Sequence, residues 1–176
     1  MEQPVTTNKA RELSIAYHEA GHVAAHLVFQ IPFEEVTIKS SGFYEGRVYS
    51  KEVWIPPKNV DPGALRYHRY TNNLVTLKLA GPAARARHKG LNTADPADDT
   101  DRIHALTIID QLFTVEEEAS RQGFIESKTQ EAFEFITHKD TWNLITLLAH
   151  ELVKNKTLSQ AQCQAIFLKH YPHSYP

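Results

Sequence analysis

The sequence contains a His-Glu-x-x-His pattern, His18-Glu19-Ala20-Gly21-His22, whose residue types could hold a metal ion and activate water. On a helix, residues four apart lie on one face, about 40° apart in projection and roughly 6 Å apart along the axis. Both imidazoles can therefore reach one metal ion, and zinc is the metal that this pattern typically binds. Glu19 follows the first histidine and could serve as a general base toward a metal-activated water. The pattern predicts a zinc site with Glu19 as the catalytic residue.

A catalytic zinc site needs a third protein ligand and an open position. Asp101 is the preferred candidate, because it shares a helical stripe with Ala105, Ile108 and Leu112. Burying an unpaired carboxylate is costly, so a carboxylate on an apolar stripe normally has a cationic partner or a metal. The stripe therefore predicts Asp101 as the third ligand, with a salt bridge to an arginine as the alternative.

Several other residues could take part in the site. Asp98 and Asp99 are competing ligands, although both would also suit the first turn of a helix. Glu45 has a workable separation from the histidine pair but lies in a predicted turn. His26 continues the row of histidines, but helical twist turns it about 80° from the first ligand, which favours a packing or supporting role. His104 lies one turn after the predicted aspartate ligand and could support the site, although a partly exposed position is more typical.

Length and composition narrow the class of protein. The 176 residues suit a single domain, residues 1–176, with an ordinary hydrophobic fraction of 41%. The net charge of −2 gives no electrostatic case for nucleic acid or an anionic membrane. Cys163 is the only cysteine, which excludes an intrachain disulfide and a cysteine-based zinc site. No segment predicts a membrane span, a signal peptide or a phosphate-binding loop for ATP, so we expect a cytoplasmic protein.

The histidine pattern lies within a predicted first long helix, residues 8–29, which ends before Pro32. Short β-rich runs follow at 36–38 and 47–49, with a turn-forming stretch between them. Residues 53–55 could add a third strand. We therefore predict a small β-hairpin or meander directly after the first helix.

The rest of the chain is predicted to be helical, which makes the fold class mainly α (α+β). Asp-Pro pairs mark two helix starts, and Ser159 is predicted to cap the last helix. The expected helices span 61–79, 83–88 after a kink at Gly81-Pro82, 95–119, 128–138, 140–154 and 159–169.

Gly21 lies inside the first predicted helix. Glycine inside a helix costs about 1 kcal/mol relative to alanine. Such a residue is expected where another backbone or a bulky group must come close. We therefore predict a close helix contact at this position.

Several segments together resemble peptidase family M41, the proteolytic domain of FtsH-type membrane-anchored ATP-dependent proteases. The most specific match is 15–22, Ile-Ala-Tyr-His-Glu-Ala-Gly-His, which resembles the family's zinc-binding helix. The other similar segments occur in the family's order: 36–38 with 46–48 (edge-strand region), 79–84 (the Gly-Gly-x-Ala-Ala helix), Asp101 followed by Ala105 (aspartate ligand) and 152–158 (the closing leucine element).

The resemblance implies a mainly helical zinc metallopeptidase domain with metal ligands His18, His22 and Asp101 and with Glu19 as the base. The family's ATPase module and membrane helices have no counterpart in the sequence, and Arg85-Ala86 replaces the acidic pair that usually follows Ala-Ala. We expect a stand-alone endopeptidase for peptides or unfolded segments, which could form a homo-oligomer or use a separate ATPase or adaptor. The alternatives are a non-catalytic, zinc-binding regulatory module and hydrolysis of a non-peptide amide.

Overall fold

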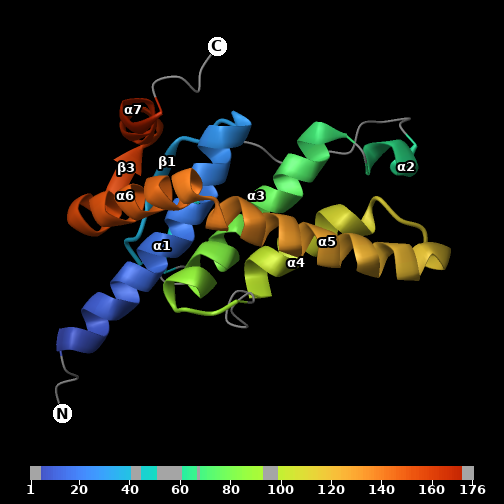
Figure 1. Ribbon diagram of the computed structural model, residues 1–176, viewed down its shortest axis with the longest axis horizontal. Coiled ribbons are helices and arrows are strands. Elements are labelled where there is room, and N and C mark those ends of the chain that lie inside the picture. The colour runs from blue at the N-terminus through green and yellow to red at the C-terminus, as the bar shows by residue number, and fades with distance from the viewer. Residues whose placement is uncertain (1–4, 41–44, 51–60, 67, 93–98, 172–176) are drawn as a thin grey trace.

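A computed structural model of the chain describes residues 5–40, 45–50, 61–66, 68–92 and 99–171. Most of these residues are helical, and their strands form one antiparallel sheet, so the predicted mainly α (α+β) fold is confirmed. Helices α1 and α3 lie side by side at the centre, and α6 packs across α1 (Figure 1). The elements in chain order are α1 (Val5–Phe29), β1 (Glu35–Thr37), β2 (Arg47–Tyr49), α2 (Pro62–Leu65), α3 (Arg69–His88), α4 (Asp99–Asp110), the 3-10 turn η1 (Val115–Glu117), α5 (Glu118–Thr137), α6 (Lys139–Asn155), β3 (Thr157–Ser159) and α7 (Gln160–His170).

Small residues let α1 and α3 approach each other closely. A Cβ atom added to Gly21 would lie 2.5 Å from the carbonyl oxygen of Ala80 and 2.7 Å from Cβ of Ala84. Both distances are shorter than a normal contact, so only glycine fits at this crossing. The predicted close helix contact at Gly21 is confirmed, and it fixes α1 against α3 in the middle of the histidine pattern.

Aromatic rings from α3 and α6 stack on Tyr17 of α1, the residue before His18. The ring of Tyr17 stacks on His88 with centroids 4.1 Å apart and on Trp142 with centroids 5.3 Å apart. The guanidinium of Arg87 lies 4.3 Å from the Trp142 ring centroid, a cation–π geometry. Because offset-stacked rings resist rotation of the side chains, this stack helps to fix the orientation of α1.

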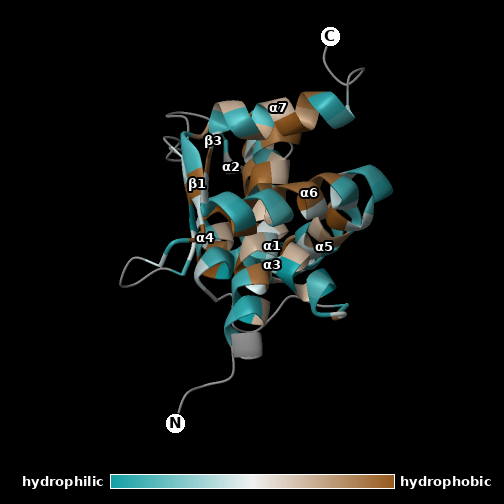
Figure 2. Ribbon diagram, turned by 90° about the vertical axis from the view of Figure 1, so that its left-hand side faces the viewer, coloured by the Kyte–Doolittle hydropathy of each residue, from teal (hydrophilic) through white to brown (hydrophobic). Residues whose placement is uncertain are grey.

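The sheet has the strand order β2-β1-β3 and lies along one side of the helices (Figure 2). Val36 pairs with Val48 on one side and with Leu158 on the other, both antiparallel. The predicted strands near 36–38 and 47–49 are confirmed. The possible strand at 53–55 lies outside the described residues, and the third strand comes instead from Thr157–Ser159. Lys156 has a left-handed backbone (φ 66°) that ends α6 and turns the chain back onto β1.

The predicted boundaries of the helices 61–79 and 83–88 are wrong. The chain forms the short α2 and the long α3, and α3 continues to His88 with Pro82 inside it. The amide of Asn72 donates to the carbonyls of Arg66 and His68, which stabilises the break before α3. Arg66 also donates to the carbonyl of Leu112, at 2.7 Å, and so holds this break against a distant segment.

The predicted helices 95–119 and 128–138 also have wrong boundaries. Residues 95–98 lie outside the described residues, α4 ends at Asp110, and α5 begins ten residues before the predicted position. The Glu117 carboxylate accepts a hydrogen bond from the Thr114 backbone N–H at 2.9 Å, which favours a new helix start. Phe113 packs against Phe124 with centroids 5.5 Å apart, so the turn is also fixed by its side chains.

Helix α6 includes the predicted residues 140–154 and has one apolar face. This face buries Leu144, Ile145, Leu148 and Leu152 in the core, whereas His150 on the other side is exposed. Helix α7 follows, with the predicted cap Ser159 accepting a hydrogen bond from the Gln162 backbone N–H. Among the helices that the structure describes, none combines the length and apolar character needed to cross a membrane.

His26 is buried at the end of α1, where its Nδ1 lies 2.9 Å from the carbonyl oxygen of Ile31. Burial lowers the pKa of His26 from 6.5 to about 4; the hydrogen bond to Ile31 opposes this shift, and the charges of His22 and Lys78 add to it. As the pH falls, His26 therefore binds a proton at a higher pH in the unfolded chain than in the folded chain. The resulting stability is present above pH 6.5 and is lost as the pH falls toward 4.

His26→Gln keeps a donor for the Ile31 carbonyl but does not titrate. Between about pH 7 and about pH 4, we expect the free energy of unfolding of the wild type to fall by up to about 3 kcal/mol more than that of the variant. Urea unfolding at a series of pH values, with chelator present throughout, measures this difference. Parallel pH profiles for the two proteins would contradict the assignment.

Candidate metal centre

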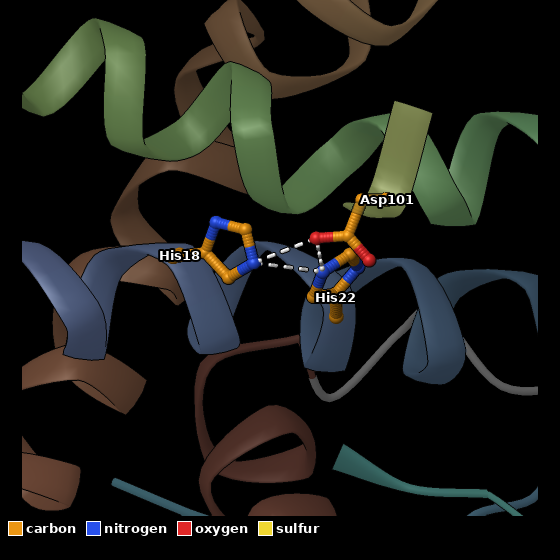
Figure 3. Close-up of side chains that lie close together, drawn as sticks. All are labelled: His18, His22 and Asp101. Carbon is orange, nitrogen blue, oxygen red and sulfur yellow. Dashed lines mark hydrogen bonds and ion pairs between the residues drawn. The ribbon is translucent and has the colours of Figure 1, made fainter. Parts of the chain in front are cut away.

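Three side chains from two helices converge on one point. His18 and His22 extend from α1, and Asp101 reaches them from the first turn of α4 (Figure 3). The Nε2 atoms of the two histidines lie 3.2 Å apart, and Oδ2 of Asp101 lies 2.9 Å from Nε2 of His18 and 3.3 Å from Nε2 of His22. The structure therefore brings together the three residues that were predicted as metal ligands.

The triangle of donor atoms fits a zinc ion. With ligand bonds of about 2.0–2.1 Å, two donors of a tetrahedral zinc site lie roughly 3.3–3.4 Å apart. The three measured separations, 2.9, 3.2 and 3.3 Å, are close to that edge. Two imidazole nitrogens and one carboxylate oxygen are also a typical donor set for catalytic zinc, which leaves a fourth position open. Asp101 is partly exposed, with 21% of its side chain accessible, so this side of the site reaches solvent.

Helix α3 orients the second histidine. Nδ1 of His22 lies 2.8 Å from the carbonyl oxygen of Leu77. Because a carbonyl oxygen only accepts hydrogen bonds, Nδ1 of His22 donates to it, which leaves Nε2 as the nitrogen that can bind a metal. A Cβ atom added to Gly81 would lie 2.2 Å from that Nε2 atom. The absence of a side chain at Gly81 therefore leaves the room in which the donor atom of His22 lies.

Glu19 is buried beside this triangle, with 5% of its surface exposed. A Cβ atom added to Gly46 would lie 2.7 Å from Oε1 of Glu19, so the carboxylate packs directly against the backbone that leads into β2. Burial raises the pKa of Glu19, while the charges of His18 and His22 oppose the shift. A carboxylate whose proton affinity is raised by burial suits a group that must accept and release a proton near neutral pH.

The charge of Asp101 is stabilised within the triangle. Burial by itself raises the pKa of Asp101, but the charge of His22 and hydrogen bonds from His18 and His22 outweigh it and hold the pKa below the usual range. Asp101 is therefore ionised near neutral pH and can act as an anionic ligand. Asp101 pairs with His18 and His22 in the structure, whereas the alternative prediction was a salt bridge to an arginine.

The other candidate ligands have different positions. Asp98 lies outside the described residues, and Asp99 is the first residue of α4. Glu45 forms an ion pair with Arg11 instead of joining the triangle. His26 packs at the end of α1, as predicted for a packing residue, and His104 is exposed.

Several groups that surround the site were not predicted from the sequence. The Leu77 carbonyl has no signal in the sequence, because every residue has a carbonyl. Gly46 and Gly81 lie in segments that resemble M41 peptidases, and Gly81 was also predicted at a kink, but neither was predicted to contact a side chain of the histidine motif. A glycine within a predicted helix or next to a predicted strand is the sequence signal of such a close approach. The positive charge of Arg85 acts on Glu19 and opposes the burial effect on its pKa. Arg85 therefore adds a favourable electrostatic contribution where an acidic residue was expected from the resemblance.

The sequence was also compared with known proteins. No family profile matches the chain, and no curated protein matches it. The geometry of the site and the motifs in the sequence are therefore the basis for assigning a function.

Proposed function

We propose that the chain is a zinc-dependent metallopeptidase that hydrolyses peptide bonds. One observation carries the proposal: buried Glu19 lies within electrostatic range of three donor atoms whose spacing fits a tetrahedral zinc ion. A purely structural zinc site is normally closed by four protein ligands and has no use for a general base. The partly exposed third ligand and the adjacent carboxylate favour a catalytic site.

The residues of the chain have distinct roles in this mechanism. When bound by His18, His22 and Asp101, zinc would polarise the substrate carbonyl and lower the pKa of water toward ~7. Glu19 takes a proton from the attacking water and delivers it to the amine that leaves. The Leu77 carbonyl holds His22 in the tautomer that can bind the metal.

An extended peptide is the substrate that best suits the neighbouring sheet. Strand β2 lies at one edge of the sheet, and the residue before it, Gly46, contacts the side chain of Glu19. Peptides commonly bind to an edge strand by backbone hydrogen bonds. The resemblance of the histidine motif to M41 peptidases also supports a peptidase. We propose an endopeptidase of peptides and unfolded segments in the cytoplasm, acting alone or with a separate ATPase or adaptor.

The first test is cleavage of an unstructured protein by the zinc-loaded chain. We expect fragments to form, and we expect a chelator to stop their formation and added zinc to restore it. Mass spectrometry of the fragments locates internal cleavage sites. If the chain binds zinc tightly but yields no fragments from any unstructured substrate, the peptidase proposal is wrong and a zinc-binding regulatory module is favoured.

A further inference from the structure

A cavity lies at the carboxyl end of α1, where this helix meets the start of α7. Its volume is about 120 Å³. The polar side chains that line it are His26, Gln30, Gln160 and Gln164. None of the proposed metal ligands lines it, so it is separate from the candidate metal centre. We call it the His26 cavity.

His26 has a hydrogen-bond acceptor that the fold does not use. Only 3% of the residue is exposed, and Nδ1 donates to the carbonyl oxygen of Ile31 at 2.9 Å. Because burial lowers the pKa of His26 to about 4, the ring is neutral near pH 7 and Nε2 can accept a hydrogen bond. No hydrogen bond from the described residues reaches Nε2. Nε2 is also not among the unpartnered polar atoms that are fully enclosed, so it is open toward the cavity that the ring lines.

Three glutamine side chains add amide groups to the His26 cavity. Gln160 and Gln164 are four residues apart on α7 and therefore lie on one face of this helix. Gln30 ends α1 with a left-handed backbone (φ 58°), a conformation that favours glycine. A strained backbone position is retained where the side chain has a use. In the part of the chain that the structure describes, these three amides form no hydrogen bonds, so they can bind a ligand.

The chemistry of the lining favours a neutral ligand. Among the described residues that line the His26 cavity, none carries a carboxylate, an ammonium or a guanidinium group. An ion that entered would lose its hydration without gaining an opposite charge, which is unfavourable. An amide group, in contrast, has an N–H donor for Nε2 of His26 and a carbonyl acceptor for a glutamine amide. A cavity of about 150 Å³ can hold benzene, so about 120 Å³ has room for a smaller group such as a carboxamide.

We propose that the His26 cavity binds a neutral amide group, which donates its N–H to Nε2 of His26 and accepts a hydrogen bond at its carbonyl from a glutamine side chain. The same group occurs in a free small amide and in the asparagine or glutamine side chain of a peptide. The inference goes beyond the proposed peptidase function and does not depend on it, because the cavity contains none of the residues of the metal centre.

NMR titration of the full-length chain with acetamide tests the site. We expect the ring Nε2 signal of His26 to shift until it saturates, because this nitrogen gains a hydrogen bond. Acetate has the same shape but is charged, and N,N-dimethylacetamide has no N–H. We expect both compounds to bind at least about fivefold more weakly than acetamide, the effect of one lost hydrogen bond. A signal that does not saturate, or equal binding of the three compounds, would mean that the cavity holds only water and would overturn the proposal.

A double variant, Gln160→Leu with Gln164→Leu, tests the role of the amides. Leucine is similar in size but has no hydrogen-bonding group, so we expect acetamide to bind at least about fivefold more weakly. Gln122→Leu, a matched change at an exposed position of α5, should keep the wild-type affinity. Circular dichroism shows whether the double variant is folded. A folded double variant that binds acetamide like the wild type would contradict the proposal, and the comparison of compounds tests it in the unaltered chain.

Blocked peptides distinguish the two sources of the amide. We compare Ala-Gln-Ala with Ala-Glu-Ala, which replaces the amide by a carboxylate. If the Gln peptide shifts the His26 signal and binds more tightly than acetamide, the site takes a peptide side chain; if acetamide binds more tightly, the site takes a free small amide. Equal binding of the Gln and Glu peptides with the same shift of the His26 signal would overturn the preference for a neutral amide.

Discussion

Replacing Glu19 by glutamine is expected to lower kcat for peptide hydrolysis by about 10²–10⁴-fold, the usual contribution of a general base. Glutamine has nearly the same shape, so it fits the buried space beside Gly46. Its amide cannot accept the proton of the attacking water. Zinc binding should not change, because Glu19 is not one of the three converging ligands. Steady-state kinetics of the zinc-loaded variant and its measured zinc content check both expectations.

Glu126→Gln is the matched control, since Glu126 is exposed on α5. This variant should keep both the activity and the zinc content of the wild type. Activity of the Glu19→Gln variant within a few fold of the wild type would contradict the proposed role of Glu19. Loss of zinc from that variant would instead indicate that Glu19 is a ligand.

Gly81→Ala is expected to weaken zinc binding by about 10–100-fold, the usual effect of disturbing the groups that orient a ligand. The new methyl group would lie 2.2 Å from the donor atom of His22, so His22 must move. Any movement away from α3 also strains the hydrogen bond to the Leu77 carbonyl. Competition with a fluorescent zinc chelator measures the affinity, and circular dichroism reports whether the helices remain.

Gly123→Ala separates this effect from the general influence of alanine on a helix. Gly123 lies within α5, and an added Cβ atom there meets nothing within 4 Å. This variant should keep the wild-type zinc affinity and gain up to about 1 kcal/mol of stability from helix propensity. If Gly81→Ala and Gly123→Ala bind zinc equally well, the contact between α3 and His22 does not position the ligand.

The parts of the site that could be predicted from the sequence depend on helical spacing. His18 and His22 are four residues apart, so their common face follows from the geometry of any α-helix. Asp101 was predicted as the third ligand because it lies on a helical stripe of apolar residues, and such a stripe marks the buried face of a helix. Both signals are local, and the structure brings the three residues together as expected.

The parts that could not be predicted depend on contacts between distant segments. Strand β3 has only three residues, and it forms because it pairs with β1 from more than a hundred residues away. The break before α3 depends on Arg66 reaching the carbonyl of Leu112. The Leu77 carbonyl and Gly81 contact His22 only because α3 packs against α1. Such long-range contacts leave no regular spacing in the sequence.

The zinc content and affinity of the wild type and of Asp101→Ala test the central claim most directly. We predict that the wild type binds one zinc ion per chain. We expect Asp101→Ala to lower the affinity more than about 100-fold, because residues that only orient ligands already contribute 10- to 100-fold. Asp110→Ala, a matched change on the exposed side of α4, should bind zinc like the wild type. Undiminished zinc affinity in Asp101→Ala would contradict a metal centre formed by His18, His22 and Asp101.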